Sequence, residues 1–152
     1  MKRLIRSHVA PLILASLALA GCQSIPGSSD PVPSEPSLYQ QLGERKGIAE
    51  VVEDLLYLIV EDERINHQFK GMDVARFHRN LTDQLCQLSG GPCTYIGREM
   101  RELHADMGIT DTQFNALAEN LILAMEENGI PTGAQNRLLK RLIPLYPEIR
   151  NL

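Results

Sequence analysis

Residues 90–114 read GGPCTYIGREMRELHADMGITDTQF and place a single histidine, His104, between two glycine breaks. Gly97 precedes a short predicted helix over 98–106, Gly108 ends it, and a long apolar helix follows. A neutral imidazole held in such a turn, beside an apolar groove, is what a haem iron requires as its axial ligand. Taken alone, a lone histidine on a short helix is more often a surface or core residue than a metal ligand, so the surrounding sequence has to decide.

Helical periodicity predicts an all-α domain over residues 37–152. Apolar residues recur every three or four positions, and Asp73 and Thr110 are suitable N-caps, the second in a capping box with Gln113. The helices expected from this spacing cover 47–61, 74–88 and 111–127, with a last one starting at Pro131. Pro144 is expected to kink that last helix. No stretch alternates with a period of two for long enough to predict a strand.

The N-terminal residues are typical of a bacterial lipoprotein signal peptide. A mostly apolar run over 9–20 is too short to span a bilayer as a stable helix, and it ends in Leu19-Ala20-Gly21-Cys22, which resembles a lipobox. The basic start of the segment consists of Lys2, Arg3 and Arg6. In a lipobox the chain is cut before the cysteine, which then carries lipid. The alternative is an ordinary secretory signal or a short membrane anchor in which the cysteine occurs by chance.

These features divide the chain into three parts. Residues 1–21 are the expected signal peptide, 22–36 a lipidated cysteine with a Pro- and Ser-rich tether, and 37–152 the folded domain. The composition of the tether cannot support a core. We expect an exported protein that is anchored by lipid to a bacterial membrane and faces the periplasm. The outer membrane is favoured by analogy, because Gln23 rather than an aspartate follows Cys22.

Charge limits the partners of the mature chain. Cutting before Cys22 removes three of the 15 Lys and Arg residues and none of the 19 Asp and Glu residues, which changes the net charge from −4 to −7. So acidic a surface argues against nucleic acid and against an anionic bilayer as the binding partner. Membrane attachment is therefore expected through lipid on Cys22 rather than through a basic face.

Two cysteines remain in the folded domain, Cys86 and Cys93. Because an exported compartment permits disulfides, we expect the two to pair and to close the end of a helix onto the loop that follows it. A loop this short would contribute ~2.5 kcal/mol in the chain-entropy model. The alternative is two free thiols.

The motifs of several enzyme classes do not occur in the sequence. No histidine pair has the HExxH spacing, the two cysteines do not form a zinc pattern, and GxSxG, P-loop and GxGxxG motifs are absent. Hydrolase, zinc-enzyme and nucleotide-binding functions therefore lack support. Of the other histidines in the domain, His67 is expected on the surface. His78, beside Phe77 on a helix, is compatible with either water or a pocket.

A series of short sequence pieces falls in one order along the domain. They are Leu38-Tyr39, Leu42-Gly43, Val51-Val52-Glu53-Asp54, Phe69-x-Gly71, Gly90-Gly91-Pro92, Tyr95-x-Gly97, Met100, His104, Gly108-Ile109-Thr110 and Phe114. In this order and spacing, the chain from about Leu38 to Ile149 resembles the group I truncated haemoglobins. The resemblance implies a two-over-two helical sandwich, the truncated globin fold, around haem b.

The resemblance also implies roles for single residues. His104 falls at the family's proximal iron ligand, and Phe69 falls at the phenylalanine that stacks on the haem. The other implied cofactor-binding residues are Phe77, Leu81, Tyr95, Met100, Ile109 and Phe114, of which the last three line the proximal side. The residues themselves add one detail. The carbonyl of Met100, one helical turn before the histidine, is placed to accept the other ring N–H and fix the imidazole tautomer.

The chain departs from the family pattern on the distal side. An ungapped alignment puts Leu56 where the family has a tyrosine, and Tyr57 comes one residue, about 100° of helix rotation, too late. Leu81 stands where relatives often carry a glutamine, and Phe77 stands at the gate. The expected distal pocket therefore lacks a clear hydrogen-bond donor, which predicts weak retention of oxygen. The alternative is that His78 swings inward as a sixth iron ligand.

The resemblance implies a haem protein that binds diatomic gases, with a role in oxygen binding or transport, nitric oxide handling or redox sensing. Nitric oxide dioxygenase or peroxidase activity would depend on an external electron donor, because no flavin or reductase segment is recognisable in the sequence. A binding protein is therefore expected rather than an enzyme. The alternatives are a structural or interaction lipoprotein that keeps the fold without haem, and a haem chaperone.

Overall fold

The computed structural model describes residues 35–152. The expected signal peptide, the lipidation site Cys22 and nearly all of the tether lie outside the described residues. The helical segments are α1 (Leu38–Gln41), α2 (Glu44–Glu61), η1 (Asn66–Phe69), α3 (Val74–Leu88), α4 (Met100–His104), α5 (Asp111–Glu127), α6 (Thr132–Leu142) and η2 (Ile143–Glu148). Within this part of the chain no residue lies in a strand. None of its helices is long and apolar enough to cross a membrane.

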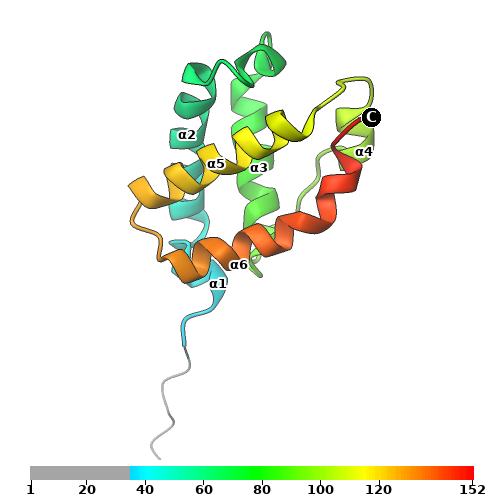
Figure 1. Cartoon of the computed structure of the whole chain (residues 1–152). Helices are drawn as coiled ribbons and strands as arrows, with labels where there is room; N and C mark the ends of the chain where they lie inside the picture. Colours follow the sequence, from blue (N-terminus) through cyan, green and yellow to red (C-terminus); the bar gives the residue numbers. More distant parts are fainter. Residues whose placement is uncertain (1–34) are drawn as a thin grey trace, which may run out of the picture. The chain divides into compact units, whose positions relative to one another are not determined.

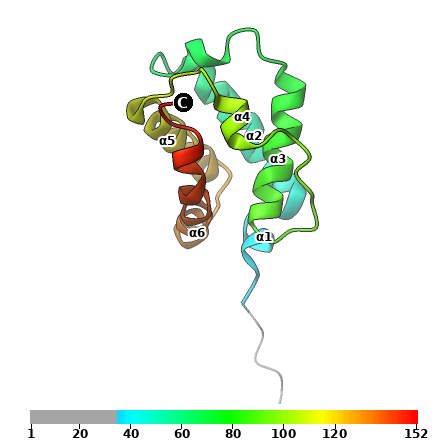
Figure 2. The ribbon, with the colours of Figure 1, turned by 90° about the vertical axis from the view of Figure 1, so that its right-hand side faces the viewer.

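Two pairs of helices form the body of the domain. α2 packs along α3, and α5 crosses α2 before the chain turns into α6. Figures 1 and 2 show the pairs as two layers, with α2 and α3 in one and α5 and α6 in the other. The short helix α4 packs against η2 at the end of the second pair. The predicted all-α, two-over-two fold is confirmed.

Local sequence signals set the starts of the two helices that were predicted best. α3 covers Val74–Leu88, and the side chain of its N-cap Asp73 accepts a hydrogen bond from the Arg76 N–H. α5 covers Asp111–Glu127 and begins with the expected capping box of Thr110 and Gln113. In both cases a polar cap directly precedes an apolar periodic run, so the helix start was readable from the residues alone.

Two other helix ends differ from the prediction. α2 begins at Glu44, earlier than expected, because Gly43 adopts a φ of 76° and its carbonyl accepts the Gly47 N–H at 2.8 Å. Pro131 is the N-cap of α6 rather than its first helical residue. Pro144 lies just past the end of α6, in η2, a tighter helix into which α6 continues. Figure 1 shows the chain changing direction in this region.

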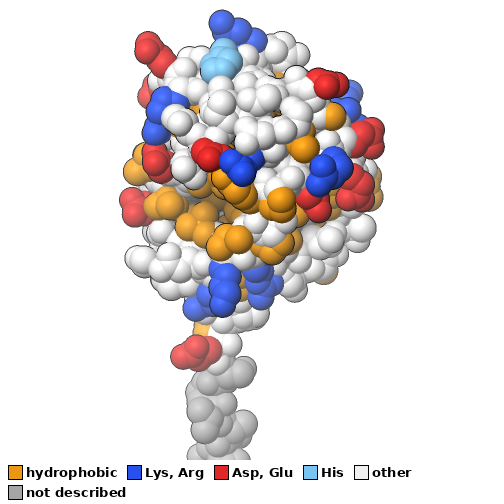
Figure 3. Space-filling view, turned by 45° about the vertical axis from the view of Figure 1, so that its right-hand side comes forward, with side chains coloured by type: hydrophobic (Ala, Val, Ile, Leu, Met, Phe, Trp, Pro, Cys, Tyr) orange, Lys and Arg blue, Asp and Glu red, His pale blue; other side chains and the backbone are white. Residues whose placement is uncertain are grey.

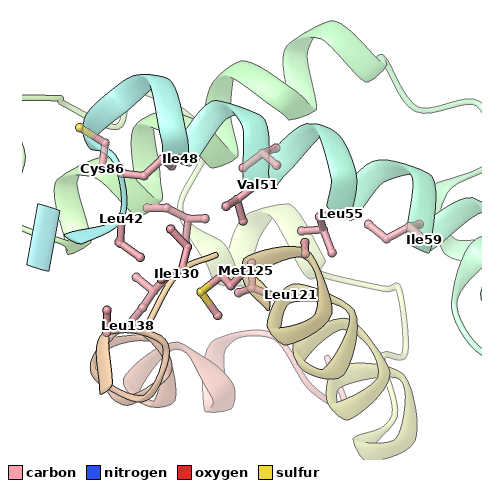
Figure 4. Close-up of a cluster of buried hydrophobic side chains, with 14 of the residues drawn as sticks. Leu42, Ile48, Val51, Leu55, Ile59, Cys86, Leu121, Met125, Ile130 and Leu138 are labelled. Carbon is pink, nitrogen blue, oxygen red and sulfur yellow. The ribbon is translucent and has the colours of Figure 1, made fainter. Parts of the chain in front are cut away.

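The core lies between α2 and the α5–α6 layer (Figure 4). α2 contributes Ile48, Val52, Leu55 and Ile59, whose spacing places them on one face of the helix. The facing side chains are Leu121 and Met125 of α5, Ile130, and Leu138 of α6. This apolar contact holds the two layers together, and it adjoins a cavity whose lining shares Leu55, Leu85 and Leu121 with the core.

Asp62, just after α2, ties the end of that helix to α5. Its carboxylate accepts from Arg64 Nη2 at 2.8 Å and from Asn120 Nδ2 at 2.9 Å. Arg64 also pairs with Glu119 on α5, at 2.6 Å. The hydrogen bonds from the Arg64 side chain outweigh the partial desolvation of the carboxylate and hold the pKa of Asp62 well below its usual range.

We expect Asp62→Asn to lower the melting temperature at pH 7, and we expect the difference from wild type to shrink in acid. The unfolded pKa lies near 3.9, so ionised Asp62 stabilises the fold above about pH 4. That contribution is lost as the pH falls through the depressed folded pKa. Circular dichroism melts at neutral and acidic pH measure the difference. Glu126→Gln, at an exposed carboxylate, serves as the control. A difference of constant size across this range would contradict the prediction.

Cys86, near the end of α3, and Cys93 are joined by a disulfide. The turn between them is tight, since Gly90 has a φ of 85° and the Gly91 N–H donates to the Cys86 carbonyl at 2.9 Å. A Cβ at Gly91 would lie 2.5 Å from Tyr39 Cδ2 and 2.7 Å from Cys86 Sγ, so the close approach requires glycine. The cross-link thus fixes the start of the segment that leads to α4.

We expect Cys93→Ser to lower the free energy of unfolding by ~2.5 kcal/mol, because the short cross-link no longer restricts the unfolded chain. Urea unfolding with and without a thiol reductant provides the measurement. In reductant, the wild-type protein should fall to about the stability of the variant, whereas the variant itself should not respond. The prediction is wrong if the wild-type protein is equally stable in both conditions.

Candidate functional site

An apolar cavity of about 810 Å³ is lined by residues of α2, η1, α3, α4, α5, α6 and η2. This volume is typical of pockets that hold small molecules or cofactors. The predicted cofactor-binding residues that line it are Phe69, Phe77, Leu81, Tyr95, Met100, His104, Ile109 and Phe114. Figure 3 shows hydrophobic side chains gathered in a hollow of the surface, with charged groups around it. The structure therefore brings all of these side chains to one place.

His104 lies at the end of α4 and lines the cavity. Its Nδ1 is 2.8 Å from the carbonyl oxygen of Met100, one turn earlier. Because a carbonyl oxygen can only accept, Nδ1 carries the proton and the lone pair of the neutral ring is on Nε2. A hydrogen bond of this kind fixes both the tautomer and the orientation of a ligating imidazole. The side chain is thus prepared to bind a metal centre within the cavity.

The segment that follows His104 is held in place by residues far along the chain. The Gly108 N–H donates to the Leu152 carbonyl at 3.1 Å, and the Asn151 N–H donates to the Ile109 carbonyl at 2.9 Å. These two backbone hydrogen bonds close the end of the domain over the loop between α4 and α5. Helical periodicity contains no signal for such a contact between two irregular segments.

Asp111, the first residue of α5, strengthens this closure. Its carboxylate accepts from the Tyr146 hydroxyl and from Arg150 Nη1, each at 2.7 Å. These hydrogen bonds lower the pKa of Asp111, and the same contact with Asp111 raises the pKa of Tyr146. The Tyr146 ring also meets Phe114 edge to face, with centroids 4.7 Å apart. One wall of the cavity therefore depends on the contacts of Asp111 with Tyr146 and Arg150, which were not predicted from the sequence.

Leu55, and not Leu56, lines the cavity from α2. Leu55 is 1% exposed, whereas Leu56 is only partly buried and lies outside the lining. The structure therefore corrects the predicted distal residue by one position, or about 100° of helix rotation. The helical spacing of Ile48, Leu55 and Ile59 indicates that these residues share the buried face of α2. The ungapped alignment led instead to Leu56. Tyr57 is 67% exposed and does not line the cavity.

The wall that Leu55 joins is apolar. Phe69 and Phe77 meet edge to face, with centroids 5.6 Å apart and rings at 89°, and Leu81 follows one turn after Phe77. None of these side chains carries a hydrogen-bond donor. Asn80 also lines the cavity, but it is rotated from Leu81 by about 100° around α3.

Two glutamines that line the cavity contact methionines that also line it. The Gln68 amide donates to the Met107 carbonyl at 3.4 Å, and the Gln84 amide lies 3.3 Å from Met100 Sδ. Met100 and Met107 line the cavity, and so does Met72. Three of the chain's five methionines therefore lie at the cavity surface. Polarizable thioethers on flexible side chains adapt to the irregular outline of a ligand.

Two arginines border the apolar lining. Arg76 of α3 pairs with Asp73 at 3.5 Å, and the backbone carbonyl of Arg98 accepts the Tyr95 hydroxyl at 2.8 Å. Burial also raises the pKa of the Tyr95 hydroxyl. Both arginine residues are exposed and line the cavity, where their cations are available to the carboxylates of a bound ligand.

His78 does not line the cavity. Its Nε2 lies 3.0 Å from the carbonyl of Ala49 on α2, so the ring is directed into the contact between α2 and α3. His78 is partly buried there, and Thr82, one turn later, is fully buried. This arrangement gives no support to His78 as a sixth ligand. His67 is exposed as predicted, and its Nε2 lies 3.0 Å from the amide nitrogen of Gln113.

The helical domain matches known proteins along most of its length. A family model described as bacterial-like globin matches residues 37–151. The chain belongs to the bacterial-like globin family. The relatives of this globin include the group 1 truncated haemoglobin of Tetrahymena pyriformis, 32% identical over 104 residues that cover 68% of this chain and 86% of the relative. Another is that of Mycolicibacterium paratuberculosis, 30% identical over 113 residues that cover 74% of this chain and 83% of the relative.

Solved structures agree with this assignment of the chain to the globin family. The crystal structure of the Tetrahymena pyriformis truncated haemoglobin in its Fe(III) form has a TM-score of 0.74 and 28% sequence identity to this chain. The match covers 77% of this chain and 100% of that structure. The resemblance to group I truncated haemoglobins, inferred from short sequence pieces, is thereby confirmed.

Proposed function

We propose that this globin binds haem b in its cavity through His104, and that a diatomic gas binds beside Leu55, Phe77 and Leu81. The observation that carries the proposal is the hydrogen bond from His104 Nδ1 to the Met100 carbonyl. It leaves Nε2 with the ring's lone pair in an otherwise apolar cavity. The names of the related haemoglobins support the same cofactor.

The lining residues fit haem in polarity as well as in size. Apolar walls suit the faces of a porphyrin, and Arg76 and Arg98 provide cations for its propionate carboxylates. When bound, haem supplies the iron at which a gas is held. The chain's own residues orient the imidazole, exclude water and determine how polar the gas pocket is.

The gas pocket favours ligands that need no hydrogen bond. Oxygen held at a haem carries partial negative charge and is retained better when a donor faces it. Because Leu55, Phe77 and Leu81 offer no donor, oxygen should leave quickly, whereas carbon monoxide and nitric oxide should be less affected. A role in oxygen binding or transport, or in nitric oxide handling, is consistent with this pocket. Turnover of nitric oxide would require an external electron donor.

Haem titration of the purified full chain tests the proposal. A Soret band that saturates at one equivalent is the expected result, with ferric, ferrous and carbon monoxide spectra of histidine-ligated haem. Because His78 is bonded to Ala49, the ferrous form should have five ligands. A six-coordinate ferrous spectrum that His78→Ala abolishes would restore the alternative ligand. Failure to take up haem would favour a structural or interaction lipoprotein with the globin fold.

The same proposal includes anchoring by lipid on Cys22, in the periplasm and with the outer membrane favoured. It is supported by the lipobox-like Leu19-Ala20-Gly21-Cys22 and by the Cys86–Cys93 disulfide, which suits an oxidising compartment. Metabolic labelling with a tagged fatty acid tests it. The label should appear on the wild-type protein and be absent from Cys22→Ser, and an unlabelled wild-type protein would exclude the anchor.

A further inference from the structure

A basic groove lies on α6, away from the cavity. Arg137, Lys140 and Arg141 line it together with Leu88 and Pro144. The helical spacing of the three basic residues places them on the outer face of α6, where all three are exposed. None of them forms an ion pair with a carboxylate among residues 35–152. Within the described part of this acidic protein, three cations without an ion pair therefore lie in one place.

A series of contacts connects the groove to the point where the tether meets the domain. The Arg137 guanidinium donates to Gln41 Oε1, and Gln41 Nε2 donates to the Pro36 carbonyl at 2.6 Å. Pro36 directly precedes Ser37, the N-cap of α1, and α1 packs against α6. Figure 3 shows cationic side chains near the beginning of the described chain, with one acidic side chain next to them.

We propose that this groove binds phosphate headgroups of anionic phospholipids in the membrane that carries the lipid on Cys22. The proposal rests on the lipid anchor proposed above. Residues 23–36 reach at most about 50 Å even when fully extended, so Ser37 and the groove stay near the bilayer surface. Salt screens charges beyond about 10 Å, so cations facing the membrane outweigh carboxylates elsewhere on the domain. Overall acidity opposes binding from solution but not contact after anchoring.

The groove is suited to phosphate because its guanidinium groups are held in place. Arg141 donates to the Leu88 carbonyl, Arg137 donates to Gln41, and arginine matches phosphate oxygens with paired donors. Lys140, between them in the sequence, adds a third cation. The opposite face of α6 lines the cavity through Leu139 and Leu142. Headgroup binding would therefore orient the cavity relative to the membrane.

Lysine labelling tests the groove directly. Beyond residue 22 the lysines are Lys46, Lys70 and Lys140, and only the last lies in the groove. The full chain is placed on phosphatidylcholine vesicles with or without phosphatidylglycerol, treated with a membrane-impermeant amine reagent and analysed by mass spectrometry. Phosphatidylglycerol should slow labelling of Lys140 about fivefold, the factor contributed by one basic residue at an anionic surface. The other two lysines should be unaffected, and high salt should remove the protection.

The double variant Arg137→Gln/Arg141→Gln should lose this protection, whereas the matched Arg79→Gln/Arg101→Gln, at exposed arginines outside the groove, should keep it. Equal labelling of Lys140 on the two kinds of vesicle overturns the proposal. If the groove variant fails to fold, the wild-type comparison still decides. Flotation of the full chain with uncharged phosphatidylcholine vesicles tests separately whether the lipid on Cys22 anchors the protein. If the chain does not float with these vesicles, the anchor is absent and the groove proposal fails with it.

Discussion

Replacing His104 by glycine is expected to abolish the Soret band of haem-titrated protein, and millimolar imidazole is expected to restore it. Loss of an outer partner of a metal ligand typically costs 10–100-fold in affinity, so loss of the ligand itself should cost more than about 100-fold. Glycine leaves space beside α4 for a free imidazole, which can then supply the missing nitrogen. Absorption spectra during titration measure both the loss and the rescue.

Two other histidine variants serve as controls for this result. His78 is hydrogen-bonded to the Ala49 carbonyl and His67 is on the surface, so alanine at either position should leave haem uptake unchanged. Circular dichroism of the His104 variant should show the same helix content as wild type. If the His104 variant takes up haem as tightly as wild type, the assignment of the ligand is wrong.

Leu55→Tyr is expected to slow oxygen dissociation by about 10- to 100-fold. The new hydroxyl would enter the cavity wall beside Phe77 and Leu81, where the structure provides no donor. A hydrogen bond to a charged group contributes about 1.5–3 kcal/mol, which corresponds to this range of rates. Stopped-flow mixing of the oxygen complex with carbon monoxide measures the rate. Carbon monoxide dissociation should change much less.

The neighbouring positions provide a matched control. Leu56→Tyr makes the same chemical change one residue later, outside the lining, and should leave the oxygen rate unchanged. Tyr57→Phe removes an exposed hydroxyl and should also have no effect. Asn80→Leu tests whether the amide next to Leu81 contributes. If Leu56→Tyr slows oxygen loss and Leu55→Tyr does not, the rotation of α2 is that of the ungapped alignment and not of the structure.

The parts of the fold that were predictable are those set by neighbouring residues. Asp73 and Thr110 each precede an apolar run at helical spacing, and α3 and α5 follow directly from that combination. The contact of His104 with the Met100 carbonyl was predictable for the same reason, because residues four apart meet on adjacent turns of one helix.

The parts that were not predictable depend on contacts between distant residues. Whether Leu55 or Leu56 faces the cavity is decided by how α2 rotates against α5, and one residue of offset changes the face. The contacts of Asp111 with Tyr146 and Arg150 join segments more than thirty residues apart, with no local pattern to link them. The basic groove likewise needs Leu88, at the end of α3, beside the cations of α6.

The methionines of the cavity wall give this globin a limited resistance to oxidants. Peroxide that reaches the cavity would convert the thioethers of Met72, Met100 or Met107 to sulfoxides, which are polar and larger. Met100 is the critical member, because it is buried and its backbone carbonyl orients His104. Damage at this one residue would disturb the wall and the imidazole together. The reversible oxidation of one thioether would then act on haem ligation without unfolding the domain.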